Sequence, residues 1–185
     1  MFRLDGKTAL VSGASRGLGW GMAEALAKQG AHVFLNGRNL ASLEQRAVEL
    51  TSNGFLATVV AFDVTRSENV KQTIDQIVAS HGALDIVIAN AGIQHRSPIV
   101  DFNEDDFRRV MDTNLTSVWS MAKEASRHMI QSGGGRIIFT GSITADLGRA
   151  TISAYIASKG GVHALARQLA VELGGQGITT NVIAP

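Results

Sequence analysis

Tyr155 and Lys159 stand four positions apart in a stretch with helical spacing. Residues four apart lie on one face of a helix, so the phenol and the ammonium are expected to lie within reach of each other. A free phenol has a pKa of about 10, and a neighbouring ammonium favours its ionised form, which makes a usable general acid and base. Ser142, expected at the end of a strand, could donate to the same carbonyl oxygen that Tyr155 would protonate. A lone Tyr-x-x-x-Lys pair is common by chance, so its meaning depends on its companions.

A glycine-rich turn near the start of the chain is the strongest companion. Residues 12–19 run Ser-Gly-Ala-Ser-Arg-Gly-Leu-Gly, after an apolar run and before a helical pattern. Gly13 permits a sharp turn off the strand, Gly17 a close approach of backbone to a ligand, and Gly19 tight packing of the helix on the sheet. Free N–H groups at the helix start can bind a pyrophosphate. With Ser15, Arg16 and Leu18 between the glycines, the whole turn is a candidate dinucleotide site, although its spacing is not the commoner G-x-G-x-x-G.

The elements that must position these groups alternate along the chain. Apolar runs predict strands at 8–11, 31–36, 55–62, 84–89, 136–140 and 178–183. Helical spacing predicts helices over 17–30, 40–50, 70–78, 105–131 and 153–173. Strands so far apart cannot form hairpins, so the pattern predicts an α/β fold: a doubly wound parallel sheet, Rossmann-like, with helices on both faces.

Ligands of such sheets bind beyond the carboxyl ends of the strands. The polar and small residues at those positions are Gly13, Arg38, Asp63, Asn90, Ala91, Gly92, Ser142 and Pro185. We therefore expect one site along this edge of the sheet.

Composition excludes other classes. The chain has 185 residues, a formal net charge of +1 and no cysteine. Scattered charges argue against nucleic acid or a membrane surface as partner. The five histidines lack metal-ligand spacing, so no metal site is expected. With no apolar signal segment near the N-terminus, a single-domain cytoplasmic protein is predicted over residues 1–185.

Taken in order, the turn at 12–19, Asn90-Ala91-Gly92, Asn114, Ser142 and Tyr155-x-x-x-Lys159 closely resemble the short-chain dehydrogenase/reductase family. The resemblance covers essentially the whole chain. It implies a nicotinamide-dependent oxidoreductase with Tyr155 as proton donor or acceptor. Lys159 would assist the phenol and bind the nicotinamide ribose, Ser142 would hold the substrate oxygen, and Asn114 would anchor a water that links Lys159 to solvent.

Cofactor choice follows from charge. An acid at the end of the second strand would accept the adenosine ribose hydroxyls, but Asn36 and Gly37 stand there instead. Arg16 and Arg38 match positions where NADP-preferring members of the family place basic residues, and guanidinium groups suit phosphate. NADP is therefore the expected cofactor, with NAD as the alternative if both arginines are solvated loop charges.

Three further cofactor contacts follow from the resemblance. Asp63 would accept from the adenine amino group, with the Val64 N–H beside it; alternatively, Asp63 caps the helix that starts near Ser67. Asn90 is expected to serve partly by tying neighbouring strands together.

The leading hypothesis is hydride transfer between nicotinamide and a small carbonyl or secondary alcohol, of the sugar-acid type (gluconate 5-dehydrogenases) or the 3-oxoacyl type. The alternatives are a dinucleotide-binding module without turnover and an epimerase or dehydratase that recycles its cofactor. The resemblance also implies a homo-oligomer, a tetramer or a dimer. Family members continue past the position of Pro185 through a substrate-covering loop, a last helix and a seventh strand, so we expect this chain to lack those parts.

Overall fold

The computed structural model describes residues 2–185 and contains one parallel sheet. Its strands run in the order β3-β2-β1-β4-β5-β6, and every neighbouring pair is parallel. Their bounds are β1 (Thr8–Val11), β2 (His32–Gly37), β3 (Ala57–Ala61), β4 (Ile86–Ala89), β5 (Gly135–Thr140) and β6 (Ile178–Ile183). The predicted doubly wound α/β fold is confirmed.

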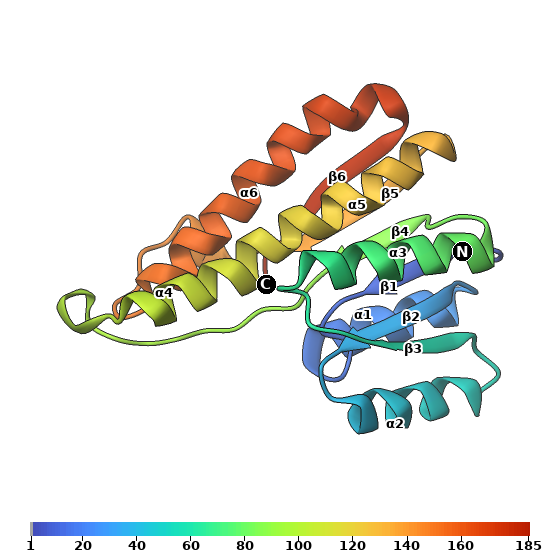
Figure 1. The fold of residues 1–185 in the computed structure, drawn as a ribbon, viewed down its shortest axis with the longest axis horizontal. Coiled ribbons are helices and arrows are strands. Elements are labelled where there is room, and N and C mark those ends of the chain that lie inside the picture. Colours follow the sequence, from blue (N-terminus) through green and yellow to red (C-terminus); the bar gives the residue numbers. More distant parts are fainter. Residues whose placement is uncertain (1) are drawn as a thin grey trace.

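Helices cover both faces of this sheet (Figure 1). One face carries α1 (Gly17–Lys28) and α2 (Leu40–Thr51), and the other carries α3 (Ser67–His81), α5 (Ser117–Gln131) and α6 (Ser153–Leu173). Side chains alternate along each strand, so β1 serves both layers: Leu10 packs with the α3, α5 and α6 side, while Ala9 and Val11 pack with the α1 and α2 side. Each apolar face is therefore buried, as a parallel sheet requires.

The long helix predicted at 105–131 is interrupted. It consists of α4 (Glu104–Met111), one π-helical turn named η2 (Asp112–Thr116), and α5. Asn103 caps α4 by accepting from the backbone N–H groups of Asp105 and Asp106. A π turn holds one extra residue per turn and often occurs at functional sites. Here it contains the buried Asn114.

Three short 3₁₀ turns complete the chain: η1 (Ile99–Asp101), η3 (Ile143–Ala145) and η4 (Gly174–Gln176). In Figure 1, α4 and the loop before it form an arm that projects from the body of the molecule. Within residues 2–185, no helix combines the length and the apolar character that a membrane crossing needs.

The strand order reverses between β1 and β4, because the chain moves outward from β1 to β3 and then returns to β4 on the other side. Such a switch point separates the loops that follow the two central strands and leaves a crevice between them. The loops after β1 and β4 carry the glycine turn and Asn90-Ala91-Gly92.

Candidate active site

A cleft of about 730 Å³ lies at the carboxyl edge of the sheet. It brings together fourteen of the residues predicted from sequence: Gly13, Ser15, Arg16, Gly17, Leu18, Gly19, Arg38, Asp63, Val64, Asn90, Ala91, Gly92, Tyr155 and Lys159. The cleft also contains residues that sequence reasoning missed or did not assign: Asn36, Gly37, Phe62, Thr65, Ile93, Gln94, Arg109, Thr113 and Thr140. The size suits a small-molecule or cofactor site.

The glycine turn is packed tightly at one end and open at the other. A Cβ on Gly19 would lie 2.2 Å from the carbonyl oxygen of Gly13 and 2.5 Å from Nδ2 of Asn90. A Cβ on Gly17, where φ is +58°, would meet no atom within 4 Å. Gly19 therefore lets α1 press against the turn, while Gly17 faces open space. The predicted roles of the two glycines agree with this geometry.

The turn is held from outside by Arg46 of α2. Its Nε donates to the carbonyl oxygen of Ser15 at 3.2 Å, and its guanidinium carbon lies 4.7 Å from the ring centroid of Trp20. Nη1 also pairs with Glu49 at 2.7 Å. Sequence reasoning missed Arg46, because the contact joins residues 31 positions apart on different elements.

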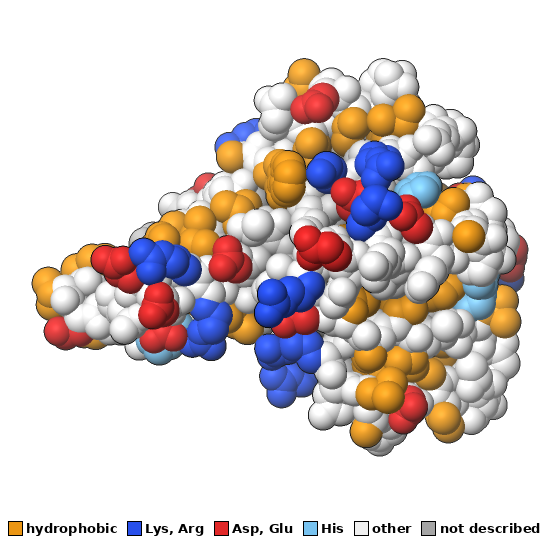
Figure 2. Space-filling model, viewed as in Figure 1, with side chains coloured by type: hydrophobic (Ala, Val, Ile, Leu, Met, Phe, Trp, Pro, Cys, Tyr) orange, Lys and Arg blue, Asp and Glu red, His pale blue; other side chains and the backbone are white. Residues whose placement is uncertain are grey.

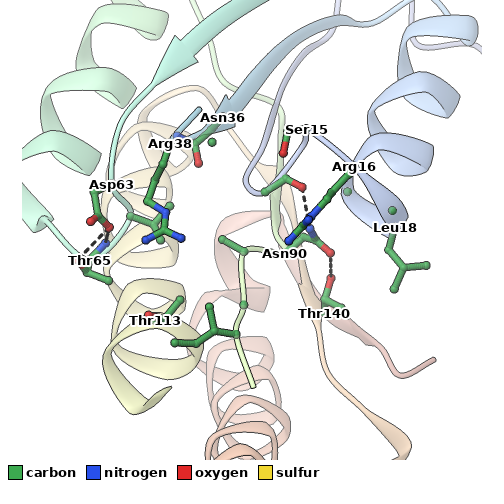
Figure 3. Close-up of a pocket in the computed structure, with 18 of the residues that line it drawn as sticks. Ser15, Arg16, Leu18, Asn36, Arg38, Asp63, Thr65, Asn90, Thr113 and Thr140 are labelled. Atoms are coloured by element: carbon green, nitrogen blue, oxygen red, sulfur yellow. Dashed lines mark hydrogen bonds between the residues drawn. The ribbon is translucent and has the colours of Figure 1, made fainter. Parts of the chain in front are cut away.

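The end of the cleft beside β2 is basic. Figure 3 shows Arg16 and Arg38 extending toward the middle of the cleft from opposite sides. Asn36 is fully buried and donates to the carbonyl oxygens of Val60 and Phe62 at 3.1 Å each, so its side chain serves the β2–β3 contact. Basic side chains also line both sides of the notch between the α4 arm and the α2 lobe (Figure 2).

Asp63 lies beside this basic end. Its carboxylate accepts from the backbone N–H and the hydroxyl of Thr65 at 3.0 and 2.9 Å. The Thr65 backbone N–H is the largest cause that lowers the pKa of Asp63, and Arg38 adds to it. The cap position of α3 belongs to Arg66, so the alternative that Asp63 caps this helix is wrong.

Tyr155 and Lys159 lie on one face of α6, as predicted. Nζ of Lys159 is 5.7 Å from the centroid of the Tyr155 ring and donates to the carbonyl oxygen of Thr140 at 2.6 Å. Lys159 is 4 % exposed. Burial lowers its pKa from 10.5 to about 8, because an ammonium loses hydration inside the protein.

Asn114 connects the π turn to this pair. Its Oδ1 accepts from the Ile93 N–H at 2.8 Å, and its Nδ2 donates to the Ile93 carbonyl and to the Ser158 hydroxyl at 2.9 and 3.2 Å. Ser158 in turn donates to the carbonyl oxygen of Tyr155 at 2.7 Å. The amide therefore joins the loop after β4 to the first turns of α6. Asn114 stands beside the cleft and does not line it.

Ser142 and Pro185 also lie next to the cleft and outside its lining. Ser142 follows β5 by two residues and caps η3, with its Oγ 2.9 Å from Oγ1 of Thr144. The turn η3 packs against α6, and the carbonyl oxygen of Pro185 accepts from the Ile143 N–H at 3.5 Å. Both residues thus flank the Tyr155 side of the site.

No histidine is among the residues that line the cleft. His95 lies 3.5 Å from a carboxylate oxygen of Asp106 and packs on Phe102. Across residues 2–185, no cluster of three or more His, Asp or Glu side chains could hold a metal ion.

The comparisons with known proteins agree with this geometry. A family model described as short chain dehydrogenase matches residues 7–185. Gluconate 5-dehydrogenase of Gluconobacter oxydans is 40% identical over 185 residues, which cover all of this chain and 72% of that protein. The 3-oxoacyl-[acyl-carrier-protein] reductase of Vibrio cholerae is 35% identical, covering 98% of this chain and 73% of the reductase.

A solved structure shows the same fold. The gluconate 5-dehydrogenase of Burkholderia cenocepacia, in complex with NADP and tartrate, superposes with a TM-score of 0.95 at 40% identity, covering all of this chain and 72% of its own.

Proposed function

Since the chain belongs to the short-chain dehydrogenase family, we propose that its cleft binds NADP(H) and that its Ser142, Tyr155, Lys159 and Asn114 serve hydride transfer. The reaction converts a small carbonyl compound and the corresponding secondary alcohol into each other. An oxidoreductase of this class is what the sequence predicted.

One observation carries the proposal: a single cleft joins the glycine turn to the Tyr155–Lys159 pair. The residues present fit a dinucleotide. Gly17 opens onto free space at the start of α1, where neither a side-chain cap nor an acidic residue occupies the first turn. N–H groups there can bind a pyrophosphate. Arg16 and Arg38 stand at the adenosine end and suit a 2′-phosphate.

The residues of the chain divide the remaining work. The bound nicotinamide would supply or accept the hydride, and the protein would position the substrate and polarise its carbonyl group. Tyr155 gives a proton to the substrate oxygen during reduction and takes it back during oxidation. The Lys159 ammonium has three N–H donors and uses one for its hydrogen bond to the Thr140 carbonyl oxygen. The other two can bind the ribose and the phenol. Ser142 holds the substrate oxygen, and Asn114 fixes the loop and helix that meet at the pair.

A sugar acid is the substrate class that we propose. The relatives named gluconate 5-dehydrogenase and the 5-keto-D-gluconate 5-reductase of Escherichia coli support it. The 3-oxoacyl reductase, 35% identical to this chain as the Escherichia coli 5-reductase is, supports the second class. Turnover of 5-ketogluconate against an acetoacetyl thioester, each with NADPH, decides between them.

Replacing Tyr155 with Phe tests the mechanism. Tyr155→Phe keeps the ring and removes the transferable proton, so kcat should fall by about 10²–10⁴ while NADPH binding stays within twofold. Loss of NADPH absorbance with the ketone measures kcat, and nicotinamide fluorescence measures binding. Full activity in this variant would refute the role of Tyr155.

The same assay separates the alternatives. NADPH binding without consumption across a panel of ketones would favour a module without turnover. Product formation without net oxidation of NADPH would favour an epimerase or dehydratase. Consumption of NADPH equal to alcohol formed supports the reductase.

We also propose a homo-oligomer formed through α5 and α6. Trp119 on α5 is 49% exposed and Val171 on α6 is 83% exposed, which leaves apolar surface for a second copy. A cytoplasmic location remains a prediction from sequence.

A further inference from the structure

We propose that Thr140 is a positioning residue that ties the reacting end of the cleft to the glycine turn. The inference rests on the proposed function, because it concerns how the same cleft holds a dinucleotide. Thr140 is the last residue of β5, is 8% exposed, and lines the cleft between its two ends.

The backbone of Thr140 serves the reacting end. Its carbonyl oxygen accepts from Nζ of Lys159 at 2.6 Å, which is the only hydrogen bond of that ammonium to the described residues. The direction in which the ammonium points is therefore set by where the end of β5 lies. A shift of that strand end would move Lys159 relative to Tyr155.

The side chain of Thr140 serves the turn. Its hydroxyl donates to Oδ1 of Asn90 at 3.0 Å, and Nδ2 of Asn90 donates to the carbonyl oxygens of Ser12 and Gly13 at 3.0 and 3.4 Å (Figure 3). One continuous path of hydrogen bonds therefore runs from Lys159 through Thr140 and Asn90 to the turn after β1. It crosses three adjacent strands at the edge where the ligand would bind.

The hydroxyl also fixes which way the Asn90 amide points. An amide has an acceptor end and a donor end, and the turn offers only carbonyl oxygens. A donor on the opposite side is what holds Oδ1 there and keeps Nδ2 on the turn. Without it, Oδ1 has no partner and the amide can turn away, which releases the carbonyl of Gly13.

The main chain at Asn90 has its own support, so the side-chain path can be tested separately. The backbone N–H groups of Asn90 and Ala91 both donate to the Ser12 hydroxyl, at 2.9 and 3.0 Å. A variant without the Thr140 hydroxyl keeps these bonds, and the carbonyl that binds Lys159 is also kept.

Thr140→Val is the first variant, because valine has the same shape and lacks the hydroxyl. We expect its dissociation constant for NADPH, measured by nicotinamide fluorescence, to rise about five- to tenfold, while Thr140→Ser stays within twofold of wild type. Thr180→Val is the matched control: Thr180 is also buried, on the neighbouring strand β6, and its hydroxyl has no partner in the described part of the chain. It should bind NADPH as wild type does.

Asn90→Ala completes a double-mutant cycle. If the hydroxyl acts through Asn90, Thr140→Val should change the dissociation constant less than twofold in the Asn90→Ala background. Equal effects of Thr140→Val in both backgrounds would overturn the inference, since the hydroxyl would then touch the dinucleotide directly or act through packing. If Asn90→Ala does not fold, the other variants still test the inference. It would be overturned if Thr140→Ser bound NADPH as weakly as Thr140→Val, or if Thr180→Val weakened NADPH binding as much as Thr140→Val. Wild-type protein that binds no NADPH or NADH would instead refute the proposed function.

Discussion

We expect Arg38 to discriminate between the two nicotinamide cofactors. It is exposed at the rim of the cleft, next to Asp63, while the buried Asn36 is engaged with β3. The side chain at the end of β2, where an acid would accept the ribose hydroxyls, therefore binds the neighbouring strand instead. The Arg38 guanidinium is therefore available for the 2′-phosphate that we propose at this end of the cleft.

Arg38→Ala should raise the dissociation constant for NADPH roughly 10- to 100-fold, because hydrogen bonds to charged groups are worth about 1.5–3 kcal/mol. NADH, which has no 2′-phosphate, should change less than threefold. Arg66→Ala is the control, since Arg66 also lies near Asp63 but does not line the cleft. Equal weakening of NADPH and NADH by Arg38→Ala would refute the assignment.

Lys159 makes the stability of the protein depend on pH. Burial lowers its pKa to about 8 in the folded protein, against 10.5 for an exposed lysine. Between these values the unfolded chain binds more protons than the folded one, so the free energy of unfolding rises with pH. Below pH 8 both states are protonated and this contribution has no slope.

We predict that the wild-type free energy of unfolding gains on the order of 3 kcal/mol relative to Lys159→Met between pH 8 and 10.5. Urea unfolding of both proteins, without cofactor, at half-unit steps measures the difference. A constant difference across this range would mean that the lysine is not held in a site that disfavours its charge.

At this scale, sequence identified the groups whose roles follow from residue type and spacing. Tyr155, Lys159 and the glycines were found because a phenol beside an ammonium, or a residue without Cβ, has few equivalents. Thr140, Arg46 and Asn36 were not assigned, since a threonine or an asparagine acquires such a role only through the strand that folds beside it.

The helix α1, which follows the glycine turn, differs from α2 and α4 at its N-terminus. The helix α1 begins without a side-chain cap, whereas α2 is capped by Asn39 and α4 by Asn103. Gly19 and Gly21 both lie inside α1, but their surroundings differ. Gly19 touches the turn, and a Cβ on Gly21 would meet no atom within 4 Å.

Gly19→Ala should destabilise the protein by about 1–3 kcal/mol and abolish dinucleotide binding, because the new methyl group forces α1 away from Gly13. Gly21→Ala should instead stabilise it by roughly 0.5–1 kcal/mol, since alanine is the better helix former. Urea unfolding curves check both, and fluorescence titration checks binding. Similar effects of the two substitutions would contradict the packing described for Gly19.

The π turn is the feature of this scale that sequence could not predict. Helical spacing continues from 104 to 131 without a proline or glycine, so one helix was the natural expectation. The extra residue is accommodated because Asn114 bonds both backbone groups of Ile93, 21 positions away. The helix propensities of residues 104–131 do not indicate such a long-range contact.

For the molecule as a whole, we propose that self-association uses the outer faces of α5 and α6. Trp119 lies there with Nζ of Lys123 5.4 Å from its ring centroid. Trp119→Glu should therefore reduce the sedimentation coefficient to that of a monomer at micromolar concentration, because a carboxylate cannot be buried unpaired between two copies. Lys123→Ala is a milder neighbouring control. An unchanged coefficient would place any interface elsewhere.

The parallel sheet and its cover of helices on both faces were predicted from sequence, since apolar runs separated by helices leave few ways to build a sheet. The order of the strands was not predicted. Strand ends were less accurate: the third strand was expected at 55–62 and the fourth at 84–89, against Ala57–Ala61 and Ile86–Ala89. Hydrogen bonding to neighbours decides where a strand stops, and apolar character extends past that point.

The central strand is also the first to be made. β1 pairs with β2 and β4, and Thr8 contacts Asp85, 77 residues later in the chain. At a synthesis rate of about 5–20 residues per second, β1 waits on the ribosome for roughly 4–15 s before this partner is even translated. During that time the nascent chain presents one uncovered edge of β1, whose four residues are all buried in the folded protein, so we expect chaperones to bind this segment.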